Sequence, residues 1–320
     1  MASQLFWIGL GNMGRVIWVS INMSIQGMSM NLAEKGSHDK PLLVYNRTKK
    51  RADDLVEKVG SGKAEALESV EDGVKRSNII FTSLSNDKAV EELYASILKS
   101  GDLKGKLFVE TSTIHPDTTE RVAKSLTDAG AEFVASPVFG APAAADAAQL
   151  IFVPAGPKSS VNKLRPFIQG VMGRAEIPFE DKPYGSALKL KLIGNTFVLN
   201  MVTQLAEALT VAEKVELGTE PVKQFVDLFV GGPWSAYGER MIQGVYHKME
   251  APLFSADNAV KDASHALDLG QAVGVELKNA QVAKEYAQDV AKHAGGDKGD
   301  IAGIYGAVRL RSGLEYENDA

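Results

Sequence analysis

The sequence predicts an α/β domain followed by an all-α domain. In the first half, short apolar runs alternate with helical patterns, which is typical of a doubly wound parallel sheet with helices on both faces. A glycine-rich turn follows the first apolar run, as in Rossmann-type folds. Strand patterns stop near residue 183, and helical patterns follow. We therefore expect a dinucleotide-binding domain over 1–183 and a helical domain over 184–320.

The first expected strand is the apolar run Gln4–Ile8, which leads directly into the pattern Gly-x-Gly-x-x-Gly. The first glycine of such a pattern allows a tight turn, the second lets a pyrophosphate approach the backbone, and the third lets helix and strand pack closely. The helix N-terminus offers N–H groups and a positive dipole end to the phosphates. The expected cofactor turn comprises Gly9, Leu10, Gly11, Asn12, Met13 and Gly14.

The second expected strand, Pro41–Tyr45, ends in Asn46, Arg47 and Thr48. NAD-binding domains place an Asp or Glu at this strand end, where it accepts a hydrogen bond from the ribose 2′-hydroxyl. An acid would repel a 2′-phosphate, whereas an arginine attracts one. We therefore predict NADP(H) as the cofactor, with Arg47 beside its 2′-phosphate. The alternative interpretation is a solvated basic helix start.

The spacing between these two motifs is unusually long. Gly14 and Asn46 are 32 positions apart, against about 20 in an ordinary dinucleotide-binding unit. The excess coincides with the apolar segment VIWVSINMSIQ at 16–26. A helical extension, a looped-out segment and a gene-model error such as a retained intron each account for it.

The other elements of the first half continue the alternation. We expect further strands at 78–84, 106–110, 132–134 and 150–153, and helices at 52–59, 89–99 and 117–129. Ligands of parallel sheets bind beyond the carboxyl ends of the strands. Two further polar motifs fall at such ends, and they supply the expected cofactor-binding residues Leu84, Ser85 and Thr111.

The second half shows helical patterns throughout. A long one over 184–217 ends at Gly218, and others follow at 220–230, 236–245, 256–273, 277–294 and 300–311. Lys191 and Asn195 lie at i and i+4 of the long helix, so they share one face. A lysine held near a nicotinamide can donate a proton to a developing alkoxide. From spacing alone, a plain surface lysine fits equally well.

Composition narrows the class of protein. The net charge of −5 argues against nucleic-acid binding. The lack of cysteine excludes a thiol nucleophile and a disulfide framework, and the five histidines show no metal-ligand spacing. The apolar segment at 16–26 is too short to span a bilayer. We therefore expect a cytoplasmic protein with a small-molecule substrate and no metal, nucleic-acid or membrane partner.

Several motifs occur in order along the chain: Gly-Leu-Gly-Asn-Met-Gly at 9–14, Asn-Arg-Thr at 46–48, Thr-Ser-Thr-Ile at 111–114, Pro-Val-x-Gly at 137–140, Lys-x-x-x-Asn at 191–195, Lys-Asp at 261–262 and Gly-Asp at 299–300. As a set they resemble the β-hydroxyacid dehydrogenases of the 6-phosphogluconate dehydrogenase superfamily. That family includes 3-hydroxyisobutyrate dehydrogenase and the NADPH-dependent glyoxylate/succinic semialdehyde reductases. The resemblance covers nearly the whole chain apart from 16–26.

The resemblance implies an NADP(H)-dependent oxidoreductase that transfers a hydride between the nicotinamide and a small 3-hydroxyacid or aldehyde acid. The implied residues are Lys191 as the catalytic lysine with Asn195 as its partner, Ser112 and Gly140 at the substrate carboxylate with Thr113 nearby, and Lys261 at the cofactor. Without the family, Lys261 also reads as part of a surface Lys-Asp step. Related enzymes pair through their helical domains, so a homodimer or tetramer is expected.

The chain departs from the family pattern at the substrate loop. The family reads Pro-Val-Ser-Gly-Gly, whereas residues 137–142 here read Pro-Val-Phe-Gly-Ala-Pro. Phe139 replaces a hydroxyl with a large apolar ring, and Pro142 supplies no N–H group. A carboxylate pocket thereby loses donors, which suggests a bulkier or less polar substrate. Trp234 can add an aromatic wall, although core packing of the helical domain explains it equally well.

Two other functions remain open. An imine reductase on the same fold is favoured mildly by Phe139, but imine reductases usually lack the lysine found at Lys191. A catalytically silent NADPH-binding protein that acts through protein contacts is the second alternative. The retained lysine argues against it too.

Overall fold

The computed structural model describes residues 3–11, 27–36, 40–295 and 298–318. The chain forms two compact units, which divide between Lys191 and Leu192. The expected turn residues Asn12, Met13 and Gly14 and the segment 16–26 lie outside the described residues. No helix in the described ranges combines the length and the hydrophobicity that crossing a bilayer requires.

The first unit is built on an eight-stranded sheet with the order β11-β9-β6-β5-β4-β1-β2-β3. Its strands are β1 (Leu5–Ile8), β2 (Leu42–Tyr45), β3 (Ala64–Ala66), β4 (Ile79–Thr82), β5 (Leu107–Glu110), β6 (Glu132–Ala135), β9 (Ala155–Gly156) and β11 (Phe179–Glu180). All described pairs in it are parallel except β6 with β9. The run from β3 to β6 has the Rossmann strand order, so the predicted fold class is confirmed.

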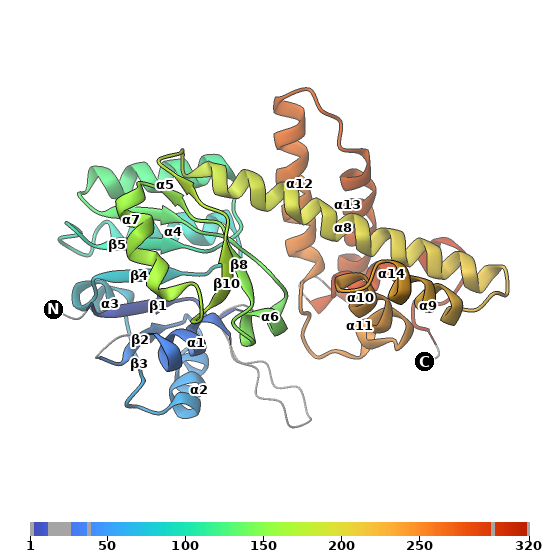
Figure 1. The fold of residues 1–320 in the computed structure, drawn as a ribbon, viewed down its shortest axis with the longest axis horizontal. Coiled ribbons are helices and arrows are strands. Elements are labelled where there is room, and N and C mark those ends of the chain that lie inside the picture. The colour runs from blue at the N-terminus through green and yellow to red at the C-terminus, as the bar shows by residue number, and fades with distance from the viewer. Residues whose placement is uncertain (1–2, 12–26, 37–39, 296–297, 319–320) are drawn as a thin grey trace. The chain divides into compact units, whose positions relative to one another are not determined.

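Helices cover both faces of this sheet (Figure 1). They include α1 (Met28–Lys35), α2 (Lys50–Val59), α3 (Val70–Arg76), α4 (Asp87–Ile97), α5 (Pro116–Asp128) and α7 (Lys158–Leu164), which is followed by the 3-10 turn Arg165–Phe167. Strand β1 shows why an unbroken apolar run is needed, because its successive side chains enter opposite cores. Leu5 and Trp7 belong to one buried cluster, whereas Phe6 and Ile8 belong to the other.

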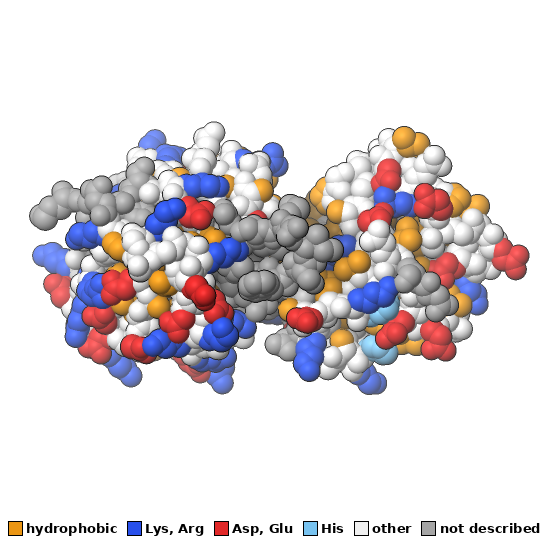
Figure 2. Space-filling model, turned by 90° about the horizontal axis from the view of Figure 1, so that it is seen from below, with side chains coloured by type: hydrophobic (Ala, Val, Ile, Leu, Met, Phe, Trp, Pro, Cys, Tyr) orange, Lys and Arg blue, Asp and Glu red, His pale blue; other side chains and the backbone are white. Residues whose placement is uncertain are grey.

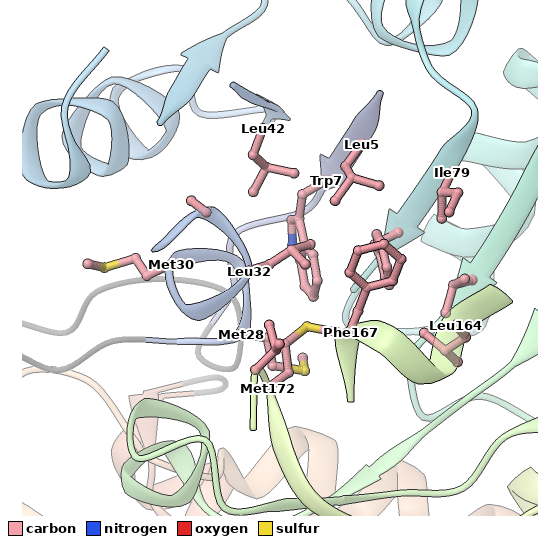
Figure 3. Close-up of a cluster of buried hydrophobic side chains, with 14 of the residues drawn as sticks. Leu5, Trp7, Met28, Met30, Leu32, Leu42, Ile79, Leu164, Phe167 and Met172 are labelled. Carbon is pink, nitrogen blue, oxygen red and sulfur yellow. The ribbon is translucent and has the colours of Figure 1, made fainter. Parts of the chain in front are cut away.

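The cluster around Trp7 joins the first helix to the sheet. The Trp7 ring stacks on Phe81 of β4, with centroids 5.5 Å apart. Figure 3 shows Trp7 pointing from β1 toward Leu32 of α1 and toward Phe167. These three side chains are at most 6% exposed. Side chains of β1, α1 and the 3-10 turn thus share one core.

A smaller three-stranded sheet has the order β10-β8-β7. Its strands are β7 (Val138–Phe139), β8 (Leu150–Phe152) and β10 (Gly173–Glu176), and α6 (Pro142–Asp146) lies between β7 and β8. The strand expected at 150–153 thus exists, but it does not continue the large sheet. It pairs antiparallel with β7, because the short connection over 140–149 suits an antiparallel return better than a parallel crossover.

The second unit contains helices throughout its described residues. They are α8 (Gly185–Lys214), whose first residues belong to the first unit, then α9 (Glu220–Phe229), α10 (Pro233–Ile242), α11 (Val245–Lys248), α12 (Ala256–Ala272), α13 (Lys278–Ala294) and α14 (Ile304–Arg311), with a 3-10 turn at Ile301–Gly303. Fully buried alanines of α12 and α13 share one core with apolar residues of α8. On the face that Figure 2 shows, acidic and basic side chains are interspersed on each unit.

The carboxyl ends of the strands approach one another most closely at Gly9. Its φ is +93°, and its amide donates to the carbonyl oxygen of Tyr45 (3.0 Å). A Cβ added there would collide with the Ser83 carbonyl oxygen and would lie 2.9 Å from Cδ2 of Leu84. Glycine is therefore required by both the backbone conformation and the space available.

We predict that Gly9→Ala destabilises the protein by about 3 kcal/mol, because positive φ and overpacking against a main-chain oxygen each cost energy. Gly11→Ala is the matched control, since a Cβ there meets no described atom within 4 Å. Thermal unfolding measures both. Gly9→Ala should unfold roughly 5–10 °C below Gly11→Ala; equal midpoints would contradict the close approach.

Candidate active site

The loops after β4 and β5 begin with main-chain hydrogen bonds to the neighbouring strands. The amide of Ser83 donates to the Ile8 carbonyl oxygen (2.9 Å), and the amide of Thr111 donates to that of Thr82 (2.9 Å). The Thr111 hydroxyl also donates to the Thr82 carbonyl oxygen (2.7 Å). The ends of β1, β4 and β5 are thus held side by side (Figure 1). This is the edge at which ligands bind in doubly wound sheets.

Asn46 links the loop after β1 to the loop after β2. Its Oδ1 accepts from the Leu10 amide (2.9 Å), and its Nδ2 donates to the Thr48 carbonyl oxygen (3.0 Å). Both polar ends of this side chain therefore bind the protein's own backbone. The neighbouring Arg47 is exposed, and in the described part of the chain it forms no hydrogen bond or ion pair. Of the two residues, Arg47 is the one available to a ligand.

The loops after β4 and β5 are joined through a buried carboxyl group, Glu110. Its Oε1 accepts from the Ser112 amide, and its Oε2 accepts from the Thr82 hydroxyl, both at 2.7 Å. The Tyr94 hydroxyl shares a 2.7 Å hydrogen bond with Thr82, and the Leu84 amide donates to Oγ of Ser112 (2.7 Å). Sequence reasoning missed Glu110, because an acid at the end of an apolar strand does not by itself show which groups it binds.

Burial changes the acidity of this network. Desolvation raises the pKa of the Glu110 carboxyl, while hydrogen bonds from Ser112, Thr82 and Tyr94 act in the opposite direction. Burial, with the nearby Glu110 charge, raises the pKa of Tyr94 well above its usual value. Ser112 is 3% exposed, with its amide bound to Glu110 and its oxygen accepting from Leu84. The Ser112 side chain also hydrogen-bonds to Glu110, so both polar groups of Ser112 belong to this network.

The other expected residues of these loops differ in exposure. Ser85 is exposed and its Oγ accepts from Asn86 (3.4 Å), whereas Leu84 is half-buried. Thr113 is also half-buried, between the buried Ser112 and Ile114. The hydroxyl residues at the strand ends therefore range from exposed (Ser85) through half-buried (Thr113) to buried (Ser112).

The substrate-loop residue Phe139 lies beside Lys191. The Lys191 ammonium nitrogen is 4.6 Å from the centroid of the Phe139 ring, in a cation–π contact. Phe139 ends β7, and the following Gly140 has φ +137°. A Cβ at Gly140 would lie 2.6 Å from Cδ2 of Leu150. The structure thus brings together the expected catalytic lysine and the loop where the chain departs from the family pattern.

In the second unit, a buried carboxylate organises two expected site residues. Nδ2 of Asn195 donates to Oδ2 of Asp262 (2.7 Å). Nζ of Lys261 is 3.0 Å from Oδ1 of Asp262, a contact with the distance of an ion pair but without hydrogen-bond geometry. Asp262 is 3% exposed. Trp234 is partly buried and packs against the core of this unit, as the core-packing interpretation expects.

Comparison with known proteins identifies two family models. Residues 4–177 match the NAD-binding domain of 6-phosphogluconate dehydrogenase. Residues 185–307 match the model described as NAD-binding of NADP-dependent 3-hydroxyisobutyrate dehydrogenase. The NADH-dependent oxidoreductase ucdB of Aspergillus ustus is 35% identical over 290 residues, which are 90% of this chain and 97% of that protein.

Solved structures support the fold. The 3-hydroxyisobutyrate dehydrogenase of Mycobacterium tuberculosis with L-serine has a TM-score of 0.76 at 22% identity, covering 97% of this chain and 100% of that one. A reductive aminase from Aspergillus terreus with NADPH4, cyclohexanone and allyl amine has a TM-score of 0.54 at 19% identity, covering 97% of this chain and 100% of that one. From the two family models and the curated relative, the chain belongs to the β-hydroxyacid dehydrogenase family of NAD(P)-binding oxidoreductases.

Proposed function

We propose that this oxidoreductase uses NADP(H) and acts on a small 3-hydroxyacid or the corresponding aldehyde acid. The observation that carries this proposal is the position of Lys191, which lies against the Phe139 ring of the substrate loop at 4.6 Å. An amine at that loop can serve the oxygen of a carbonyl or carbinol group. A nucleotide-binding protein without catalytic activity has no need of an amine at this loop.

The residues at the strand ends fit a dinucleotide. The turn at Gly9 is held tightly by the neighbouring strands, and no described atom would lie within 4 Å of a Cβ at Gly11, where a pyrophosphate would approach the backbone. The residues that would hold NADP(H) are Gly9, Leu10 and Gly11, Asn46, Arg47 and Thr48, Leu84 and Ser85, Thr111 and Lys261. When bound, the nicotinamide gives or takes the hydride.

The cofactor preference needs its own argument, because the Aspergillus ustus relative is named as NADH-dependent. Residues 46–48 offer no carboxylate to a ribose 2′-hydroxyl. Arg47 is exposed, and it is bound to no other described side chain. An arginine in that state can form charge-assisted hydrogen bonds with a 2′-phosphate. These features support NADP(H).

Lys191 would act as the general acid during reduction by donating a proton to the developing alkoxide, and as the base in the reverse direction. Asn195 lies one turn further along α8. Because Asp262 binds its Nδ2, the amide of Asn195 has a fixed orientation. Asn195 would thereby serve as an oriented polar partner of the lysine and the substrate.

The substrate carboxylate would bind near Ser112 and the main chain at Gly140, with Thr113 nearby. The Ser112 amide is not available, because Glu110 binds it. Phe139, and Trp234 from the helical domain, would provide apolar contact surface. We therefore propose an aldehyde acid with an aliphatic substituent.

We also propose that the protein forms a homodimer or tetramer in the cytoplasm. Its cofactor-binding domain would end at residue 183, and its helical domain would begin at residue 184.

A panel of substrates separates this activity from imine reduction, which Phe139 and the likeness to the reductive aminase fold favour. With NADPH, kcat/KM for at least one aldehyde acid should exceed that for cyclic imines by about tenfold or more. That factor corresponds to about 1.4 kcal/mol of transition-state binding. Turnover of imines alone would assign the protein to imine reduction, and turnover of neither would indicate a silent binding protein.

Cofactor preference can be tested at Arg47. NADPH should bind at least about tenfold tighter than NADH, a difference of roughly 1.4 kcal/mol. Arg47→Asp should erase or reverse that preference. Lys63→Asp makes the same charge change directly before β3, at the opposite end of the sheet from residues 46–48, since the Lys63 carbonyl oxygen accepts from Leu42 at the start of β2. This variant should leave the preference intact. Equal affinities in the unmutated protein, measured by fluorescence titration, would refute the NADP(H) assignment.

The lysine can be tested by truncation. Lys191→Ala should lower kcat by about 10² or more, the usual loss for a general acid or base. NADPH affinity should barely change, because the amine serves the substrate oxygen. Lys189→Ala removes an exposed lysine of the same helix and is the matched control in steady-state kinetics. Near-normal turnover of Lys191→Ala would exclude the lysine from the mechanism.

A further inference from the structure

We propose that Phe139 is a positioning residue for Lys191. The face of the Phe139 ring holds the Lys191 ammonium group in place for proton transfer. The inference rests on the proposed role of Lys191. It assigns a function to the residue at which this chain departs from the family pattern, where a serine would make no such contact.

The contact itself has the geometry of a cation–π interaction. The ammonium nitrogen lies 4.6 Å from the ring centroid, inside the distance of about 6 Å at which the ring quadrupole attracts a cation. Lysine carries its charge on a flexible four-carbon stem. A ring against its end therefore reduces the number of positions that the amine can sample.

Three features restrict the position of the Phe139 ring. Phe139 pairs with Ile151 in the small sheet, so its backbone is fixed. The turn after it depends on Gly140, whose space is closed by Leu150. The Phe139 side chain also packs, partly buried, against the second core cluster of the first unit. The backbone pairing and the packing of its side chain therefore restrict the position of the ring.

The beginning of α8 is anchored in the same cluster. Ala187 and Leu188 are fully buried within it, and Leu190 packs against it. The Gly185 amide donates to Oε1 of Glu120 on α5 (2.8 Å). Lys191 follows this anchored first turn within the first unit. Ring and lysine are thus fixed relative to each other by one packed core.

The proposal predicts a defect in turnover when the aromatic face is lost but apolar volume is kept. Phe139→Leu should lower kcat by roughly threefold to thirtyfold, the range of a partly desolvated cation–π contact, and should change the KM for NADPH little. Phe139→Tyr keeps the aromatic face and should retain kcat within about twofold. Rescue by tyrosine separates positioning by the ring from simple packing.

Phe179→Leu is the matched control. Phe179 is also partly buried against the same cluster, so its truncation costs similar packing without touching the lysine. Thermal midpoints of both variants should fall by similar amounts, while kcat falls only for Phe139→Leu. If Phe139→Leu does not fold, Phe139→Met replaces it, because methionine fills irregular gaps without an aromatic face.

A second readout does not depend on turnover. Reductive methylation with ¹³C-formaldehyde labels Lys191, and Lys191→Arg identifies its NMR resonance. The ring should shift that resonance upfield in the unmutated protein and in Phe139→Tyr, but not in Phe139→Leu. Absence of the ring-dependent shift overturns the proposal. So does unchanged kcat in Phe139→Leu despite that shift. If no substrate turns over, the proposed function fails, and the resonance alone decides whether ring and lysine meet.

Discussion

The close packing of the strand ends at Gly9 is the constraint on which the rest of the first unit depends. A Cβ atom at position 9 would overlap the Ser83 carbonyl oxygen. Strands β1 and β4 can therefore lie this close only if residue 9 is glycine. That approach brings the loops after β1, β4 and β5 to one edge of the sheet. A dinucleotide spans such an edge, because parallel strands present their loops in a row at the switch in strand order. The same constraint therefore sets the fold and the place of the site.

In each unit, a buried carboxyl group binds polar residues of the proposed site. Glu110 receives hydrogen bonds from Ser112 and Thr82 in the first unit, and Asp262 binds Asn195 and Lys261 in the second. A buried carboxyl is costly unless it is well bonded. When it is hydrogen-bonded, the carboxyl group orients the groups around it, because moving one of them would leave a buried oxygen without its partner, at a cost in free energy. This arrangement favours fixed side-chain geometry at the proposed site over maximal stability.

The features that could be predicted from the sequence are those that depend on the local pattern of residues. The glycine turn, the apolar run of β1 and the long helix α8 follow from the glycine spacing and from the pattern of apolar residues. Other features depend on contacts distant in sequence. Glu110 reads as an ordinary end of a strand until Thr82, 28 residues earlier, is seen to donate to it. Strand β8 reads like any apolar run, and its pairing with β7 and β10 in the fold places it in the small sheet. Likewise, spacing alone could not show that Lys191 lies over Phe139.

The central claim is that the strand-end loops of the first unit form an NADP(H) site beside Lys191. A crystal structure of the protein with bound NADP⁺ tests it most directly. We expect the pyrophosphate over the turn at Gly9 to Gly11, the 2′-phosphate within hydrogen-bonding distance of the Arg47 guanidinium, and the nicotinamide near Lys191 and Phe139. A cofactor bound away from that turn, or a 2′-phosphate directed into solvent far from Arg47, would contradict the account.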